Sequence, residues 1–189
     1  MKLHILFVAL AQGLLGLCCL AEDKPIQPKP MRHRITGLFS PERERDLREA
    51  VKQLSDVKLL RIDFKNAEAT FEYDADKLLN RPKPEEIPQR FNDLLRPASN
   101  HTFGIEPLST TPKNKLTLVE IPVVGLDCKA CCLAAYESVY KIEGVEQATA
   151  SFKEGLVTAL IDQEKTNRAA LETALKSRGV TLKENPKSP

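Results

Sequence analysis

Three cysteines lie close together in the second half of this 189-residue chain. Cys128, Cys131 and Cys132 belong to the stretch Gly-Leu-Asp-Cys-Lys-Ala-Cys-Cys. Converging thiolates are soft donors, which suit Cu(I) and other thiophilic ions better than Mg²⁺ or Ca²⁺. Two or three sulfurs without a nearby histidine are too few for a closed four-ligand zinc site. The spacing therefore predicts an open soft-metal site, which a partner protein completes with its own thiols.

We expect Cys128 and Cys131 to be the metal ligands. Cys128 follows a predicted strand, and Cys131 falls in the first turn of a predicted helix. Unpaired N–H groups and the positive end of the helix dipole favour thiolate over thiol at that place. Cys132 has two interpretations: it is a third ligand, or a structural thiol that turns away along the helix. Asp127 and Lys129 are expected to be solvated loop residues.

The other two cysteines lie in an apolar N-terminal stretch. Lys2 gives a positive charge, Leu3 to Leu17 is apolar, and Cys19-Leu20-Ala21 supplies small residues for cleavage after Ala21. We therefore predict a signal peptide and an exported protein, periplasmic or otherwise extracytoplasmic. A short membrane anchor and a lipoprotein site at Cys18 are the alternatives. A disulfide-stapled exported protein would spread its cysteines along the chain, so the remaining cluster indicates a site.

Composition argues against several classes of function. The chain has 28 Lys and Arg against 26 Asp and Glu, no Trp, and only 5% aromatic residues. A balanced charge with few stacking side chains gives no reason to expect a nucleic acid partner. We see no Ser-His-Asp set and no phosphate-binding glycine loop. We therefore expect no enzyme activity and no small-molecule substrate.

The segment around the cysteines predicts six elements in the order strand, helix, strand, strand, helix, strand. The strands are expected at 115–124, 145–152, 156–162 and 180–183, and the helices at 130–141 and 166–177. Lys153 to Gly155 is the predicted hairpin turn, Thr166 or Asn167 the N-cap of the second helix, and Gly179 its end. This order is the split βαβ, ferredoxin-like arrangement.

The first half of the chain repeats the pattern at an offset of 88 residues (37 to 125). Gly37 falls on Gly125, and Phe64 falls on Phe152. One offset without gaps covers about 38 residues, which favours an internal duplication. The predicted fold class is therefore α+β, with two ferredoxin-like βαββαβ units in tandem after the signal peptide.

The first unit lacks the metal-binding residues. Ser40 and Arg43 stand where the two cysteine ligands would fall. Ser40 followed by Pro41 predicts a helix N-cap and a first helical residue. His33 and His101 are expected to be exposed strand residues, with a weak two-histidine metal site as the alternative. We predict that this unit binds no metal.

The predicted domains follow from these patterns. They are a signal peptide at 1–21, a linker at 22–30, a degenerate unit without metal ligands at 31–108, a linker at 109–114, the cysteine-containing unit at 115–184 and a tail at 185–189.

Residues 116–183 resemble the heavy-metal-associated domain family, the module of copper chaperones, copper-pump N-termini and the periplasmic mercury-binding protein. The family motif is Gly-Met-x-Cys-x-x-Cys, and here Leu126 replaces its methionine. Gly144-Val145 and Asp162 match the family's later signature. The resemblance implies Cys128 and Cys131 as ligands.

The function that follows is buffering or transfer of a heavy-metal ion by thiolate exchange. Cu(I) is the ion we expect first, and Hg(II), Zn(II) or Cd(II) are alternatives that a thiolate pair also accepts. The expected partner is a metal-donor or metal-acceptor protein, either a membrane metal transporter or another chaperone. Two rival functions use the same residues differently: a thiol–disulfide redox protein, and a protein-interaction module without metal.

Overall fold

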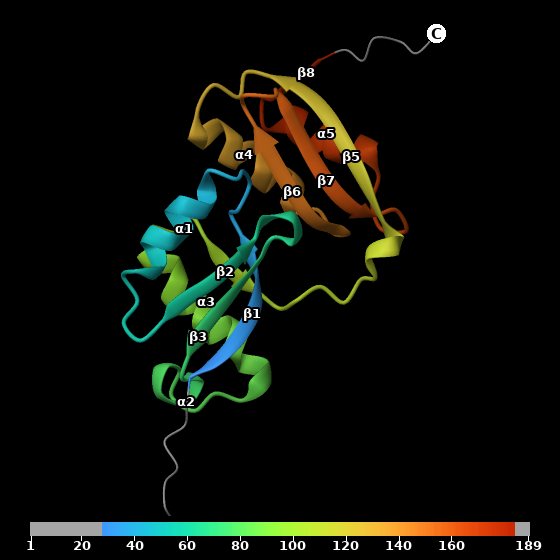
Figure 1. Ribbon diagram of the computed structural model, residues 1–189. Helices are drawn as coiled ribbons and strands as arrows, with labels where there is room; N and C mark the ends of the chain where they lie inside the picture. The colour runs from blue at the N-terminus through green and yellow to red at the C-terminus, as the bar shows by residue number, and fades with distance from the viewer. Residues whose placement is uncertain (1–27, 184–189) are drawn as a thin grey trace, which may run out of the picture.

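The computed structural model describes residues 28–183, and these form two four-stranded antiparallel sheets with helices (Figure 1). The α+β class is therefore confirmed. Within this described part, no helix has the length and apolar character needed to cross a membrane. The predicted signal peptide lies outside the described residues.

The first sheet has the strand order β2-β3-β1-β4. Its elements are β1 (Lys29–Thr36), α1 (Arg43–Val51), β2 (Lys58–Asp63), the 3-10 turn η1 (Phe64–Asn66), β3 (Glu68–Tyr73), α2 (Ala75–Leu78), the 3-10 turn η2 (Pro84–Glu86), α3 (Ile87–Ala98) and β4 (Gly104–Glu106). We call residues 29–106 the first unit. Its core joins α1 and α3 to β1 and β3 through Leu47, Phe91, Ile35 and Phe71, all fully buried.

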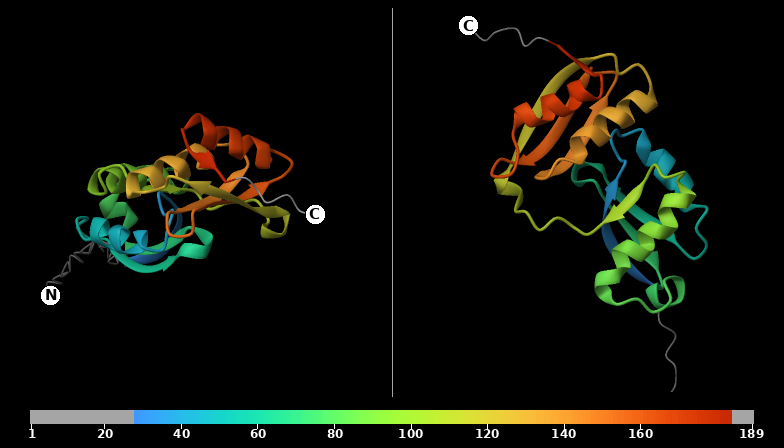
Figure 2. Two further views of the ribbon diagram at one scale, coloured as in Figure 1. Left: turned by 90° about the horizontal axis from the view of Figure 1, so that it is seen from above. Right: turned by 180° about the vertical axis from the view of Figure 1, so that it is seen from behind.

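The second sheet has the corresponding order, β6-β7-β5-β8. Its elements are the 3-10 turn η3 (Lys113–Lys115), β5 (Leu116–Val124), α4 (Lys129–Tyr140), β6 (Val145–Ser151), β7 (Leu156–Asp162), α5 (Arg168–Ser177) and β8 (Thr181–Leu182). We call residues 116–182 the second unit. Helices α4 and α5 lie on one face of the sheet (Figure 2). The predicted domain boundaries stay predictions.

Local sequence explains why the second unit adopts these elements. Buried side chains alternate along β7 and in the middle of β5, which gives each strand one face toward the helices. Asn167 is the N-cap of α5, since its Oδ1 accepts a hydrogen bond from Ala170 N at 3.1 Å. Gly155 has a φ of +59° in the β6–β7 turn, and Gly179 has a φ of +83° after α5. Leu171 and Leu175 then bury the inner face of α5.

Strand β6 forms one edge of the second sheet, and it is irregular at one residue. The pairing of β6 with β7 shifts between Val145 and Gln147, so Glu146 has no partner in the ladder. A bulge of this kind redirects the side chain of the extra residue. Here Glu146 contacts the first unit, through Arg34 on β1 at 2.7 Å.

The structure corrects several expectations about the first unit. Ser40 does not cap a helix: a turn closed by the hydrogen bond from Arg43 N to Ser40 O comes first, and α1 begins at Arg43. Strand β1 begins at Lys29, within the stretch predicted as linker. Helix α3 begins at Ile87 and includes Pro88, because proline is tolerated in a first turn, where its missing N–H has no helical partner.

The two histidines also differ from expectation. His33 is on β1 but is buried, with Nε2 3.0 Å from the hydroxyl of Tyr73. Its ring lies 5.4 Å from that of Phe91. His101 is exposed, in the turn after α3 and not on a strand. The sequence pattern places His33 on the strand correctly, but it does not reveal that the polar ring faces the core.

Candidate metal centre

The loop between β5 and α4 is shaped by one glycine and one leucine. Gly125 has a φ of +81°, a conformation that L side chains rarely adopt, and a Cβ added there would meet nothing within 4 Å. Leu126 then turns inward and is buried in the core of the second unit. Its side chain anchors the loop to that core. Asp127 and Cys128 are consequently left exposed above it.

Cys128 is the N-cap of α4. Its backbone is extended, with φ −147° and ψ 163°, and its Sγ accepts a hydrogen bond from Cys131 N at 3.2 Å. Its carbonyl accepts the first helical hydrogen bond, from Cys132 N at 3.0 Å. The sulfur therefore does what a Ser or Asp oxygen commonly does at this position. This geometry holds negative charge on sulfur at the positive end of the helix.

The thiols of Cys128 and Cys131 have pKa values shifted in opposite directions. The hydrogen bond from the Cys131 thiol, followed by the backbone amides of Cys131 and Ala130, lowers the pKa of Cys128. The same side-chain hydrogen bond, together with desolvation, raises the pKa of Cys131. Cys128 is thus the sulfur that loses its proton first. A soft cation that arrives at the loop meets one thiolate already favoured and a second thiol beside it.

Cys132 lies on a different side of α4 from this pair. It is only 2% exposed and packs in the core of the second unit, whereas Cys128 is exposed and Cys131 is partly so. Burial raises the pKa of its thiol. Among residues 28–183, no group of three or more His, Cys, Asp or Glu side chains is arranged to hold a metal ion. The structure therefore brings together Cys128 and Cys131 and sets Cys132 apart.

The loop between β1 and α1, which the predicted offset of 88 residues aligns with the cysteine loop, contains no thiol. At the positions of the two ligands it has Ser40 and Arg43. Arg43 is buried, with its guanidinium over the rings of Phe39 and Phe103 at 5.3 and 4.9 Å. It also forms an ion pair with Asp46. At the position that corresponds to Cys131, the side chain of Arg43 is therefore engaged in packing and ion pairing.

Residues of the first unit lie beside the candidate centre, which sequence patterns did not predict. Lys129, between Cys128 and Cys131 in the sequence, has its Nζ 3.5 Å from Asp46 Oδ2 on α1. Lys153 in the β6–β7 turn has its Nζ 2.7 Å from Glu42 Oε1. Contacts between residues 83 and 111 positions apart leave no local signal in a single sequence.

Comparisons with known proteins find similar solved structures. No family model matches the chain, and no curated protein matches it significantly. One similar structure is a protein described as "CopZ metallochaperone", with 22% identity, 35% of this chain and all of that chain covered, and a TM-score of 0.35. Another is oxidized MerP from Ralstonia metallidurans CH34, with 25% identity, 36% and 94% coverage, and a TM-score of 0.35.

A longer match covers both units. It is the water-soluble region of the P-type ATPase CopA from Bacillus subtilis, with 16% identity, 86% of this chain and 98% of that chain covered, and a TM-score of 0.34.

Proposed function

We propose that this protein binds a thiophilic metal ion, Cu(I) first, at Cys128 and Cys131, and that it buffers the ion or passes it to another protein by thiolate exchange. The observation that carries the proposal is the position of the two sulfurs. Both are at the start of α4, one as its N-cap, and both are accessible from outside. The ion is the cargo of this site.

The chain's own groups suit release as well as binding. Two sulfurs leave the coordination shell of the ion incomplete, so a partner's thiols can enter before the ion leaves. Leu126 holds the loop from the core, while Cys128 stays exposed. The partner we propose is a metal-donor or metal-acceptor protein, such as a membrane metal transporter or a second chaperone. Export after cleavage near Ala21 is part of the proposal.

The test is anaerobic competition of the reduced protein, without residues 1–21, against a Cu(I) chelator. We expect one ion per chain in the wild type. Cys128→Ser and Cys131→Ser should each weaken binding by more than about a hundredfold, because loss of a ligand costs more than loss of a residue that merely orients one. The matched control is Cys132→Ala, which keeps the small apolar volume in the core and should leave stoichiometry and affinity unchanged.

One result would count against metal binding, and another would count only against a site of two sulfurs. If the wild type holds Cu(I) no more tightly than Cys128→Ser, the thiol pair is not a metal site. If Cys132→Ala weakens binding as much as the other two variants, the loop rearranges to a three-sulfur site, and Cys132 is a ligand after all.

A redox function is the second candidate, favoured by the lowered pKa of Cys128 beside a second accessible thiol. A Cys-x-x-Cys pair at a helix start is also the arrangement of thiol–disulfide oxidoreductases. The reduction potential of the metal-free pair separates the two functions. A catalytic oxidant needs a potential well above that of structural disulfides, whereas a metal carrier does not.

A further inference from the structure

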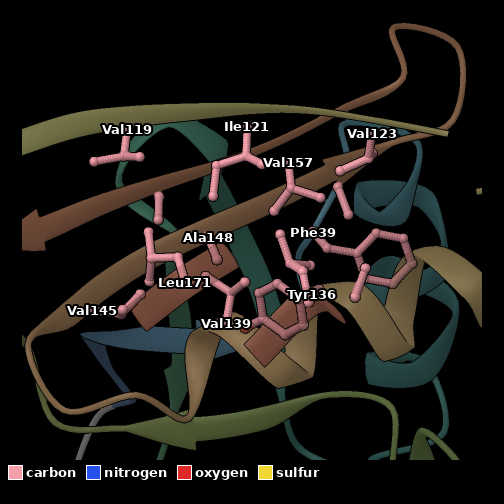
Figure 3. Close-up of a cluster of buried hydrophobic side chains, with 14 of the residues drawn as sticks. Phe39, Val119, Ile121, Val123, Tyr136, Val139, Val145, Ala148, Val157 and Leu171 are labelled. Carbon is pink, nitrogen blue, oxygen red and sulfur yellow. The ribbon is translucent and has the colours of Figure 1, made fainter. Parts of the chain in front are cut away.

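The turn between β1 and α1, residues 37–42, leaves the first unit and enters the second. Its central residue, Phe39, is 3% exposed, and it belongs to the core cluster of the second unit rather than to that of its own. The Phe39 ring lies 5.9 Å from the ring of Tyr136 on α4. Figure 3 shows Phe39 beside Tyr136 among the apolar side chains of the second unit. We call residues 37–42 the Phe39 turn.

Backbone hydrogen bonds fix this turn to the second unit. Gly37 N donates to the hydroxyl of Tyr136 at 3.0 Å. Ala150 N on β6 donates to Phe39 O, also at 3.0 Å. Because β6 is an edge strand, this amide points away from the sheet and would otherwise have no strand partner. The Phe39 turn thus supplies one of the hydrogen bonds that a neighbouring strand would supply.

Other contacts continue along the same edge. Arg34 Nη1 donates to the backbone oxygen of Glu146 at 3.4 Å and to its carboxylate at 2.7 Å. Gln147 Nε2 donates to Phe64 O at 3.1 Å. Glu106 of β4 accepts from the hydroxyl of Tyr140 at 2.7 Å and also pairs with Arg34. The first unit therefore follows β6 from its bulge almost to its end.

The charged groups at this junction are mostly shielded from water. The side chains of Arg34 and Glu146 are each 18% exposed, and the guanidinium lies 5.9 Å from the Tyr140 ring. A partly buried pair that also bonds to the backbone favours one orientation of the two units, since separation would remove the guanidinium of Arg34 from the Glu146 carboxylate. By contrast, the pairs Lys129–Asp46 and Lys153–Glu42 are largely exposed on the lysine side and contribute little.

We infer that the first unit is a permanent cap on the second: the Phe39 turn and Arg34 close the free edge of β6 and the adjoining side of α4, so that a second copy of the chain cannot add a strand there. Open edge strands are sites of unwanted pairing between chains. The occupant of this edge is the chain's own first unit. The inference goes beyond the proposed function and does not depend on metal binding.

The test uses the metal-free, reduced protein and the variants Phe39→Asp and Glu146→Arg. Amide hydrogen exchange at Ala150 reports on the hydrogen bond to Phe39 O. We expect exchange in Phe39→Asp to be at least about tenfold faster than in the wild type, because opening of the cap then needs less free energy. Sedimentation velocity should show a monomeric wild type and a Phe39→Asp variant that self-associates with concentration.

Glu146→Arg keeps the inference testable if Phe39→Asp disturbs the core of the second unit. It places two like charges at the junction and removes no apolar side chain, so Ala150 should again exchange faster while the Val157 amide stays protected. Leu60→Asp is the control, since Leu60 is an exposed apolar residue of β2. It should change neither measurement. Unchanged exchange at Ala150 in both test variants, or a monomeric Phe39→Asp with fast exchange, would overturn the cap.

Discussion

At the scale of single residues, the chemistry of the site depends on the different pKa values of the Cys128 and Cys131 thiols. One sulfur accepts backbone and side-chain hydrogen bonds, and the other supplies them. The pair therefore loses its two protons one after the other. This order matters for a metal carrier, because the first thiolate can capture an ion before the second binds.

The same difference in pKa predicts the order of alkylation. Iodoacetamide at neutral pH should modify Cys128 before Cys131, because the lowered pKa of Cys128 gives it the larger thiolate fraction of the two. In Cys131→Ala the pKa of Cys128 should rise, because the largest cause of its depression is removed. Mass spectrometry of peptides over a pH series measures both effects. Cys132→Ala is the control and should leave the Cys128 profile in place; equal reactivity of Cys128 and Cys131 in the wild type would contradict the assignment.

At the scale of elements, the loops that follow β1 and β5 begin with glycines of the same backbone conformation but have different surroundings. Gly37 and Gly125 have φ values of +83° and +81°. A Cβ on Gly125 would meet nothing within 4 Å, whereas a Cβ on Gly37 would lie 2.0 Å from Thr102 O. The glycine before Leu126 is therefore open to its surroundings, whereas the glycine of the Phe39 turn is closely covered by neighbouring backbone.

This difference predicts unequal costs for one substitution. Gly125→Ala should lower the free energy of unfolding by about 1 kcal/mol, the cost of the left-handed backbone alone. Gly37→Ala should lower it by a further 1–3 kcal/mol or so, because the neighbouring backbone must also move. Urea unfolding of the two variants beside the wild type measures the difference. Equal effects would show that the contact with Thr102 relaxes freely.

Sequence patterns predicted the elements of the second unit well because their signals are local. Alternation defined β5 and β7, Asn167 supplied a cap, and the glycines marked turns. The start of α1 was predicted too early, since a turn closed by a backbone hydrogen bond replaced the expected Ser40 cap. The two cysteines predicted as ligands lie together at the start of α4, and their role as ligands stays a prediction.

What the sequence did not reveal depends on contacts between distant residues. Nothing near Phe39 indicates that this side chain packs in the core of the other unit, because an apolar residue in a turn is compatible with either core. His33 was expected to be exposed for a similar reason: strand alternation shows that a side chain faces one side, but not which side.

At the scale of the whole molecule, His33 makes stability depend on pH. Burial lowers its pKa from 6.5 to about 4. As the pH falls, His33 is thus protonated near pH 6.5 in the unfolded chain but only near pH 4 in the folded chain. The free energy of unfolding should fall by up to about 3 kcal/mol as the pH drops through this window, and it should be unaffected by His33 above it.

Thermal or urea unfolding at several pH values checks this prediction. His33→Gln retains a hydrogen-bonding side chain beside Tyr73 but cannot titrate, so its stability should change less between pH 6.5 and 4 than that of the wild type. Parallel pH profiles for the two proteins would show that other groups cause the acid sensitivity. His101→Gln, which replaces the exposed histidine of the first unit, serves as the control.

The position of Phe39 has a consequence for how the molecule unfolds. The core that surrounds Leu171 and Val157 includes a side chain from a turn more than a hundred positions earlier in the chain. A polypeptide cut between residues 109 and 114 would lack that ring, and its sheet would keep a hole and an unpaired edge. The two units on either side of the linker should therefore unfold in one cooperative transition. Each unit, produced alone, should be less stable than it is within the whole chain.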